Sequence, residues 1–288
     1  MKKTDVLVVG SANVDMVVNS QRIPLAGETL LGGVFACNNG GKGANQAWGA
    51  SAFCKTAFCG AVGNDVFGRE YIAHLKKRNI DVSNLKVVKG VATGVALIVV
   101  AKNGENIITV ASGANEKLLP SDIKKVNFKN YSVVLFQLET PLNTVKEGLA
   151  LAKKAGCVTV LTPAPALSLP NEILKNVDFL VPNEHEILLL QKKRYTDFKE
   201  AAKSLLKKGI KNVVITLGKK GCLLVNKDGE KFFKALKVKA VDTVGAGDCF
   251  TGSFAAGLTL FNYNTENAIE LAIKAAGESV TKRGAQPE

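Results

Sequence analysis

Asp242-Thr-Val-Gly-Ala-Gly-Asp248, followed by Cys249-Phe-Thr-Gly-Ser-Phe-Ala-Ala-Gly257, is typical of a tight glycine turn that leads into a helix. Gly245 and Gly247 allow backbone conformations that a side chain would forbid, so successive amides can converge on an anion. The helix N-terminus adds N–H groups and the positive end of its dipole. A carboxylate at this joint, Asp248, suits a base that takes a proton from a hydroxyl attacking a phosphoryl group. Asp248 could instead be an N-cap, a position where aspartate is common.

Composition narrows the class of protein. The chain has 288 residues, 47% of them hydrophobic, which is enough for the core of a large α/β protein. Its six cysteines include no Cys-x-x-Cys pair, which suits reduced thiols and not a disulfide frame or a zinc site. No apolar run approaches the ~20 residues of a membrane helix. The segment Met1–Asp5 lacks the features of a signal peptide, so we expect a cytoplasmic protein with no membrane partner.

The net charge of +13 comes mostly from basic doublets spread along the whole chain. They have no interleaved aromatic residues and belong to no recognised nucleic-acid motif. We therefore expect solvated surface charge with a general attraction for anionic substrates, and no nucleic-acid partner. The two histidines, His74 and His185, are expected on the surface or in packing positions, so no histidine-based triad is indicated.

Short β-branched runs alternate with helical segments along the chain. Five runs that are apolar on both faces are predicted to be buried strands: 5–10, 133–138, 158–161, 179–181 and 213–217. Helices are predicted over 143–156 and 198–206, the first ending at Gly156 and the second stopped by Gly209. This alternation predicts the α/β class, with a mostly parallel central sheet flanked by helices on both faces. Ligands of such sheets gather at the carboxyl ends of the strands.

Two segments depart from this alternation. Residues 22–36 are rich in glycine and short apolar runs, and 93–111 is typical of a hairpin that turns at 102–106. Together they predict a small β layer beside the main sheet, either a lid or an ordinary edge extension. Since the chain contains no linker, repeat or low-complexity tract, we predict a single domain, 1–288. Its β lid would be formed by about residues 14–36 and 91–111.

Polar residues follow the first predicted strand. The segment 10–15 presents Asn13 and Asp15 there, a pair suited to vicinal hydroxyls, although Asx residues also favour turns.

The stretch Asn39-Gly-Gly-Lys-Gly-Ala-Asn-Gln-Ala47 comes next, with a cation and two amides at a predicted helix start. It is not a P-loop, because the Gly-x-x-x-x-Gly-Lys-Ser/Thr spacing is absent. Its first two glycines would let the backbone approach a polyhydroxy ligand, which Lys42 and Asn45 would bind.

Three later strands also end in polar residues. Glu139 follows the strand at 133–138. Asn183 and Glu186 begin a helix three residues apart and could hold one hydrated magnesium ion, or could simply be an acid-rich helix start. The segment 216–221 ends another strand in a glycine turn that could offer amides to a phosphate, or be a plain turn. Because strand ends of a parallel sheet share one edge, we predict that these groups converge on one crevice.

These segments together resemble the PfkB (ribokinase-like) family of carbohydrate kinases. The stretch 40–47 is similar to the first signature of the family, and 242–248 is similar to the second. The resemblance extends over 6–287 and is closest to the ribokinase branch. That closer match is carried by 10–15, 93–97, 137–139, 182–184 and 284–287.

The resemblance implies ATP-dependent phosphorylation of D-ribose at its 5-hydroxyl, giving ribose 5-phosphate and ADP. Asp248 would be the general base, and the amides of Gly245, Ala246 and Gly247 would form the anion hole. The ribose-binding residues would be Asn13, Asp15, Gly41, Lys42, Asn45, Glu139 and Asp248. ATP and Mg²⁺ would be bound by Asn183, Glu186, Thr216, Gly218, Gly221 and Gly247, with Glu186 reaching the ion through water.

The resemblance also implies K⁺ as an activator and a homodimer formed through the β lid. The K⁺ ligands would be the Asp242 carboxylate and the carbonyl oxygens of Val244, Ser279, Lys282 and Gly284. The chain departs from the family at Thr162, where an asparagine is more usual, and at Glu288, where a hydroxyl residue and a further helix are expected. Alternative functions are a kinase for deoxyribose or a nucleoside such as adenosine, and a non-catalytic sugar or nucleotide sensor.

Overall fold

The computed structural model describes residues 4–191, 193 and 195–287. Its larger sheet has eight strands in the spatial order β14-β13-β12-β11-β10-β9-β1-β4. Their bounds are β1 (Val6–Val9), β4 (Thr56–Cys59), β9 (Val133–Phe136), β10 (Val158–Leu161), β11 (Phe179–Leu180), β12 (Asn212–Thr216), β13 (Gly221–Asn226) and β14 (Gly229–Lys234). The strands from β12 to β4 run parallel, and β13 and β14 add an antiparallel edge.

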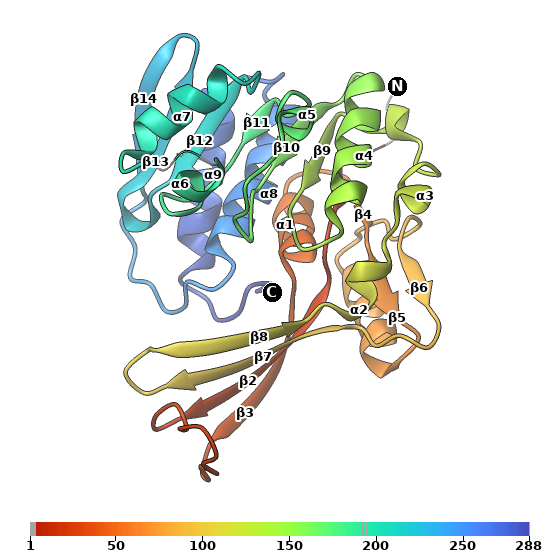
Figure 1. The fold of residues 1–288 in the computed structure, drawn as a ribbon, viewed down its shortest axis with the longest axis vertical. Coiled ribbons are helices and arrows are strands. Elements are labelled where there is room, and N and C mark those ends of the chain that lie inside the picture. Colours follow the sequence, from red (N-terminus) through yellow and green to blue (C-terminus); the bar gives the residue numbers. More distant parts are fainter. Residues whose placement is uncertain (1–3, 192, 194, 288) are drawn as a thin grey trace.

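Helices cover both faces of this sheet (Figure 1). One face carries α1 (Lys42–Ser51), α2 (Val66–Lys77), α8 (Ala246–Leu260) and α9 (Thr265–Ser279). The other carries α3 (Pro120–Ile123), α4 (Leu142–Lys154), α5 (Asn171–Leu174), α6 (Glu186–Leu189) and α7 (Phe198–Leu206). Since successive strand residues point to opposite faces, Leu7 and Val9 join one core cluster while Val6 and Val8 join the other. The predicted α/β class is confirmed.

The five predicted strands correspond to β1, β9, β10, β11 and β12. β10 has the predicted bounds, β12 lies one residue earlier than predicted, and the other three are one or two residues shorter. The two predicted helices are α4 and α7. Gly156 and Gly209 follow them with positive φ values of 77° and 103°, as expected for glycines that end helices. Three strands of this sheet were not predicted: β4, which pairs with β1 at one end, and β13 and β14, which form the other end.

A second, four-stranded sheet projects from the side of the large sheet where the chain also ends (Figure 1). It consists, in spatial order, of β3 (Val34–Gly40), β2 (Asn13–Ser20), β7 (Gly94–Ala101) and β8 (Asn106–Ala111). The predicted hairpin is present as antiparallel β7 and β8. Between β2 and β3, residues 21–33 contain no strand.

The remaining elements are short. They are β5 (Ala61–Gly63) paired with β6 (Lys86–Val88), and the 3₁₀ helices η1 (Gly113–Lys117), η2 (Phe128–Asn130) and η3 (Gly218–Lys220). All six cysteines are free thiols. In the part of the chain that the structure describes, no helix is long and apolar enough to cross a membrane.

Candidate active site

The parallel strands of the large sheet end at one edge, and a cavity of about 750 Å³ opens there. It is bounded by residues that follow β10, β11 and β12 and by the start of α8. Ten of its lining residues are predicted site residues: Lys42, Asn183, Glu186, Thr216, Gly218, Gly221, Gly245, Ala246, Gly247 and Asp248. The predicted convergence of distant segments is therefore present for this group.

The glycine turn before α8 has the conformation that the sequence requires. Gly245 is the N-cap, with φ +73°, and a Cβ placed on it would lie 2.6 Å from the Cβ of Ala285. Glycine is thus needed here both for the left-handed backbone and for the close packing. Asp248 lies in the first turn of α8 and not at its cap, so the alternative that Asp248 is simply an N-cap is wrong.

Both carboxylate oxygens of Asp248 accept hydrogen bonds from consecutive residues of α1. Asn45 Nδ2 donates to Oδ2 at 3.1 Å, and Gln46 Nε2 donates to Oδ1 at 3.2 Å. Burial raises the pKa of Asp248 above that of an ordinary carboxyl group, and nearby Lys42 opposes this rise. The result is a fixed carboxylate, more basic than usual, beside the helix N-terminus.

A chain of amides holds Gln46 in turn. Its Oε1 accepts from Nε2 of the buried Gln137 at 2.6 Å, which leaves its Nε2 to face Asp248. The same Nε2 also lies 3.0 Å from the hydroxyl of Thr162, the residue that departs from the family pattern. The sequence analysis assigned no role to Gln46, although it lies within the quoted stretch 39–47.

Asp15 lies on β2, so the alternative that it serves a turn is wrong. Its carboxylate packs over Gly40, where a Cβ would come within 2.2 Å of Oδ2. The neighbouring Gly41, with φ +87°, packs against the backbone of Asn13. These glycines therefore make room for protein groups, and not for a ligand alone. Burial, with repulsion from other carboxylates of the site, raises the pKa of Asp15 to about 6.

Lys42 and Glu139 meet at the start of α1. Glu139 Oε2 accepts from the backbone N–H of Lys42 at 3.2 Å and from the Ser11 hydroxyl at 2.5 Å. Burial alone would lower the pKa of Lys42, but the surrounding carboxylates, Asp248 first among them, raise it above the usual value for lysine. A protonated lysine among these acids partly balances their charge.

Asn13, buried at the start of β2, is oriented by a residue that the sequence analysis missed. The Asn115 Nδ2 donates to Asn13 Oδ1 at 2.8 Å, and the Asn115 side chain also bonds both backbone groups of Ala12. Asn13 therefore keeps its own NH₂ group available as a donor. No sequence pattern marks Asn115, because its partners lie about a hundred residues away.

Asn183 and Glu186 are engaged with each other at the start of α6. Asn183 Oδ1 accepts from the Glu186 N–H at 2.7 Å, and Glu186 Oε2 accepts from the Asn183 N–H at 2.8 Å. This reciprocal capping corresponds to the alternative of a helix start, although both residues still line the cavity. Burial raises the pKa of Glu186. Among the described residues, no three His, Cys, Asp or Glu side chains form a metal cluster.

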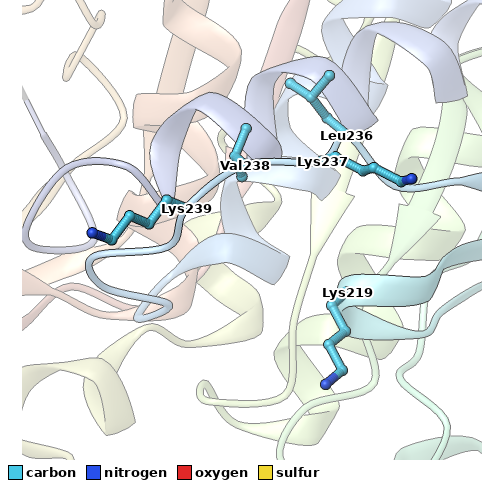
Figure 2. Close-up of a pocket in the computed structure, with 5 residues that line it drawn as sticks. All are labelled: Lys219, Leu236, Lys237, Val238 and Lys239. Carbon is cyan, nitrogen blue, oxygen red and sulfur yellow. The ribbon is translucent and has the colours of Figure 1, made fainter.

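Thr216 ends β12, Gly218 begins the 3₁₀ helix that follows, and Gly221 comes directly after that helix. Both glycines have positive φ, 55° and 121°, so the predicted glycine turn is present. Next to it, a shallow hollow of about 470 Å³ is lined by Lys219, Leu236, Lys237, Val238 and Lys239. Figure 2 shows that its three ammonium groups point away from one another, so they add general positive charge and not a convergent anion site.

The predicted K⁺ ligands lie on two turns, residues 242–244 and 279–284, and the Asp242 carboxylate bonds to both. Its Oδ1 accepts from the Val244 N–H at 3.0 Å and its Oδ2 from the Gly284 N–H at 2.9 Å. The carbonyl of Ser279 accepts from the Lys282 N–H at 3.0 Å, as part of the second turn. A carboxylate with backbone carbonyls is an all-oxygen donor set, which fits a hard cation.

Nearly the whole chain matches one family of known proteins. Residues 3–288 match the pfkB family carbohydrate kinases. The chain belongs to the pfkB family of carbohydrate kinases. In this pfkB protein, the glycine turn and Asp248 lie at the start of α8, within the matched residues.

Individual relatives cover nearly the whole chain. A ribokinase of Haemophilus influenzae is 39% identical over 292 residues, covering 99% of this chain and 95% of that one. A deoxyribokinase of Salmonella typhimurium is 37% identical, covering 98% and 94%. The solved structure of Arabidopsis thaliana ribokinase, complexed with ribose and ATP, is 30% identical, with a TM-score of 0.89 and coverage of 99% and 96%.

Proposed function

We propose that this pfkB kinase transfers the γ-phosphate of ATP to the 5-hydroxyl of D-ribose. One observation carries the proposal: Asp248, with both oxygens held by α1, stands beside the amides that begin α8 and faces the cavity. That arrangement suits a base next to an anion hole. The resemblance to ribokinases over nearly the full chain supports ribose as the acceptor.

In the proposed reaction, Asp248 takes the proton from the sugar hydroxyl as its oxygen bonds to the γ-phosphorus and the bond to ADP breaks. The N–H groups of Gly245, Ala246 and Gly247 stabilise the charge on the transferred group. Gly247 suits this role, because the space beside its Cα is open. The raised pKa of Asp248 strengthens it as a base, and Lys42 favours its ionised form at the start of the reaction.

The sugar would lie between Asp248 and the residues of β2, α1 and Glu139. Asp15, Lys42 and Glu139 would bond its hydroxyls, with the NH₂ group of Asn13 as a further donor. Gly41 and Asn45 would complete the contacts. The Arabidopsis structure contains ribose and ATP together, which supports a site with room for both in this fold.

The nucleotide would occupy the end of the cavity bounded by Thr216, Gly218 and Gly221, with Asn183 beside it. Glu186 would hold Mg²⁺ through water, and such an ion neutralises charge on the phosphates. The Asp242 carboxylate and the carbonyls of its two turns would hold K⁺. A cation bound there would help to orient the amides of the adjoining glycine turn.

We further propose that the small sheet is a lid of a single domain, and that it forms a homodimer contact. Apolar side chains are exposed on both of its faces, including Phe35 and Leu97 on one and Val34 and Ile108 on the other. A sheet with apolar side chains exposed on both faces is typical of an interaction site, and a second copy of the chain would bury these side chains. With six free thiols and ATP as its substrate, the enzyme is expected to act in the cytoplasm.

The test is ADP release with ATP and Mg²⁺ on ribose, deoxyribose, fructose and adenosine. A preference for ribose supports the proposal. A preference for deoxyribose would keep the kinase mechanism and overturn the substrate, an outcome that the Salmonella relative makes worth measuring. Binding of sugar and nucleotide without ADP release would support the sensor alternative.

A further inference from the structure

The segment Gly284–Pro287 contacts two parts of the candidate active site: the glycine turn before α8, which would form the anion hole, and helix α1, beside which the sugar would bind. On the anion-hole side, the Gly284 N–H bonds Asp242 and Ala285 packs against Gly245. On the sugar side, the Pro287 carbonyl accepts from the indole N–H of Trp48 at 3.1 Å. Between these contacts lies Gln286, whose side chain reaches α1 and α2.

The orientation of the Gln286 amide is decided by a buried tyrosine. The Tyr71 hydroxyl donates its only hydrogen to the Gly40 carbonyl, which can only accept. The Tyr71 oxygen must therefore accept from its other neighbour, Gln286, at 3.0 Å. This places Nε2 of Gln286 toward Tyr71 and Oε1 toward His74, whose Nε2 lies 2.8 Å away and must carry a proton.

The same logic continues to Asp248. Since Gln286 presents Nε2, the Asn45 atom at 2.9 Å from it must be the acceptor Oδ1. Asn45 then has only its NH₂ group left to face Asp248, which it does at 3.1 Å. If Gln286 could not donate, Asn45 could turn its oxygen toward the carboxylate, and a donated hydrogen bond would become a repulsion.

We infer that Gln286 is a positioning residue that fixes the amide of Asn45 and, through it, the carboxylate of Asp248. The inference rests on the proposed function in so far as Asp248 is the general base. It assigns the segment 284–287 a part in catalysis that is separate from cation binding, because it acts through a side chain on the sugar side of the site.

The charged groups that face Asp248 are Lys42, Glu139 and Asp15. None of them bonds Gln286, so replacing Gln286 leaves their charges in place. The hydrogen bond from Asn45 lowers the pKa of Asp248. Its loss should raise that pKa further and move the acid limb of the rate profile to higher pH.

The experiment compares Gln286→Met with Gln191→Met. Gln286 is half-buried. Gln191 is a buried glutamine with two hydrogen-bond partners, Ala201 and Ser204, which belong to α7 on the opposite face. For Gln286→Met we expect the acid limb of the kcat profile to move by about one unit to higher pH, so that kcat falls about ten-fold at pH values well down that limb and little on the plateau, with the KM for ATP unchanged. Gln191→Met should lower the melting temperature and leave the pH profile of kcat unchanged.

A second readout does not depend on activity. Titration of ¹³C-labelled aspartate carboxyls by NMR should show a higher pKa for Asp248 in Gln286→Met. A smaller rise is expected in Tyr71→Phe, which frees the Gln286 amide to turn and also removes the donor to the Gly40 carbonyl. Unchanged Asp248 titration in a folded Gln286→Met protein would overturn the inference. If the wild-type protein phosphorylates none of the sugars, the proposed function fails, while the titration still decides whether Gln286 positions Asp248.

Discussion

Replacing Asp15 by asparagine should stabilise the ligand-free protein and weaken its binding of sugar. Asp15 lies on β2 with its carboxylate over Gly40, and burial together with Glu139 and Asp248 raises its pKa from 3.8 to about 6. Above that pH the folded protein must hold a charge in a place that disfavours it. Asparagine keeps the shape of the side chain and removes the charge.

The size of the effect follows from the pKa difference. A rise of about two units corresponds to about 3 kcal/mol at neutral pH. The sign is that of an acid with a raised folded-state pKa: stability is greatest below the unfolded value of 3.8 and is lost as the pH rises through about 6. For 288 residues, 3 kcal/mol is about 5 °C in melting temperature. About half of this gap should close between pH 7.5 and pH 5.

The assay is thermal unfolding of the wild type and Asp15→Asn at a series of pH values from 5 to 8, without sugar or nucleotide. Asp228→Asn is the matched control, because Asp228 is an exposed carboxylate in the turn between β13 and β14. Asp15→Asn should melt higher at pH 7.5 and lose part of that advantage at pH 5, while the control stays level with the wild type. A difference that does not change with pH would refute the electrostatic reasoning.

The same variant tests the proposed role of Asp15 toward sugar. Loss of a charged acceptor for hydroxyl groups is expected to raise the KM for ribose about 10- to 100-fold, with little effect on the KM for ATP. In the wild type, the KM for ribose should also rise as the pH falls below about 6, because the carboxylate becomes protonated. An unchanged sugar dependence would remove Asp15 from the sugar site.

Three further predictions concern the glycine turn and its surroundings. Asp248→Asn should keep ribose affinity, measured by calorimetry, and lower kcat about 100- to 10,000-fold; near-normal turnover would contradict its role as a base. K⁺ should raise kcat over that in Na⁺ at equal ionic strength, and equal rates would argue against a cation site at Asp242. Gly245→Ala should lower the free energy of unfolding by more than about 1 kcal/mol, since the new Cβ meets Ala285 at a φ of +73°. Its control is Gly247→Ala, whose Cβ would enter open space and which should unfold like the wild type.

Local patterns in the sequence were sufficient to predict the class of fold. Strand β9 and helix α4 were predicted because side-chain periodicity and glycine stops depend only on neighbouring residues. The glycine turn before Asp248 was predicted for the same reason, since a left-handed residue such as Gly245 needs no distant partner to be recognised. Because the carboxyl ends of parallel strands share one edge, the meeting of the cavity residues also followed from the order of elements.

Only the tertiary structure showed which side chains form hydrogen bonds to the proposed catalytic and binding residues and so orient them. Gln46 and Asp248 are separated by 202 residues, and Gln286 and Asn45 by 241 residues, so no local pattern could pair them. The space beside Gly40 on β3 is filled by the Asp15 side chain from the adjacent strand β2. For Asn183, the sequence left a magnesium site and a helix start open, and the structure shows its side chain bonded at the helix start. The physical reason is that each hydrogen bond requires a particular distance and amide orientation, which only the packing of α1, α8 and the segment 284–287 establishes.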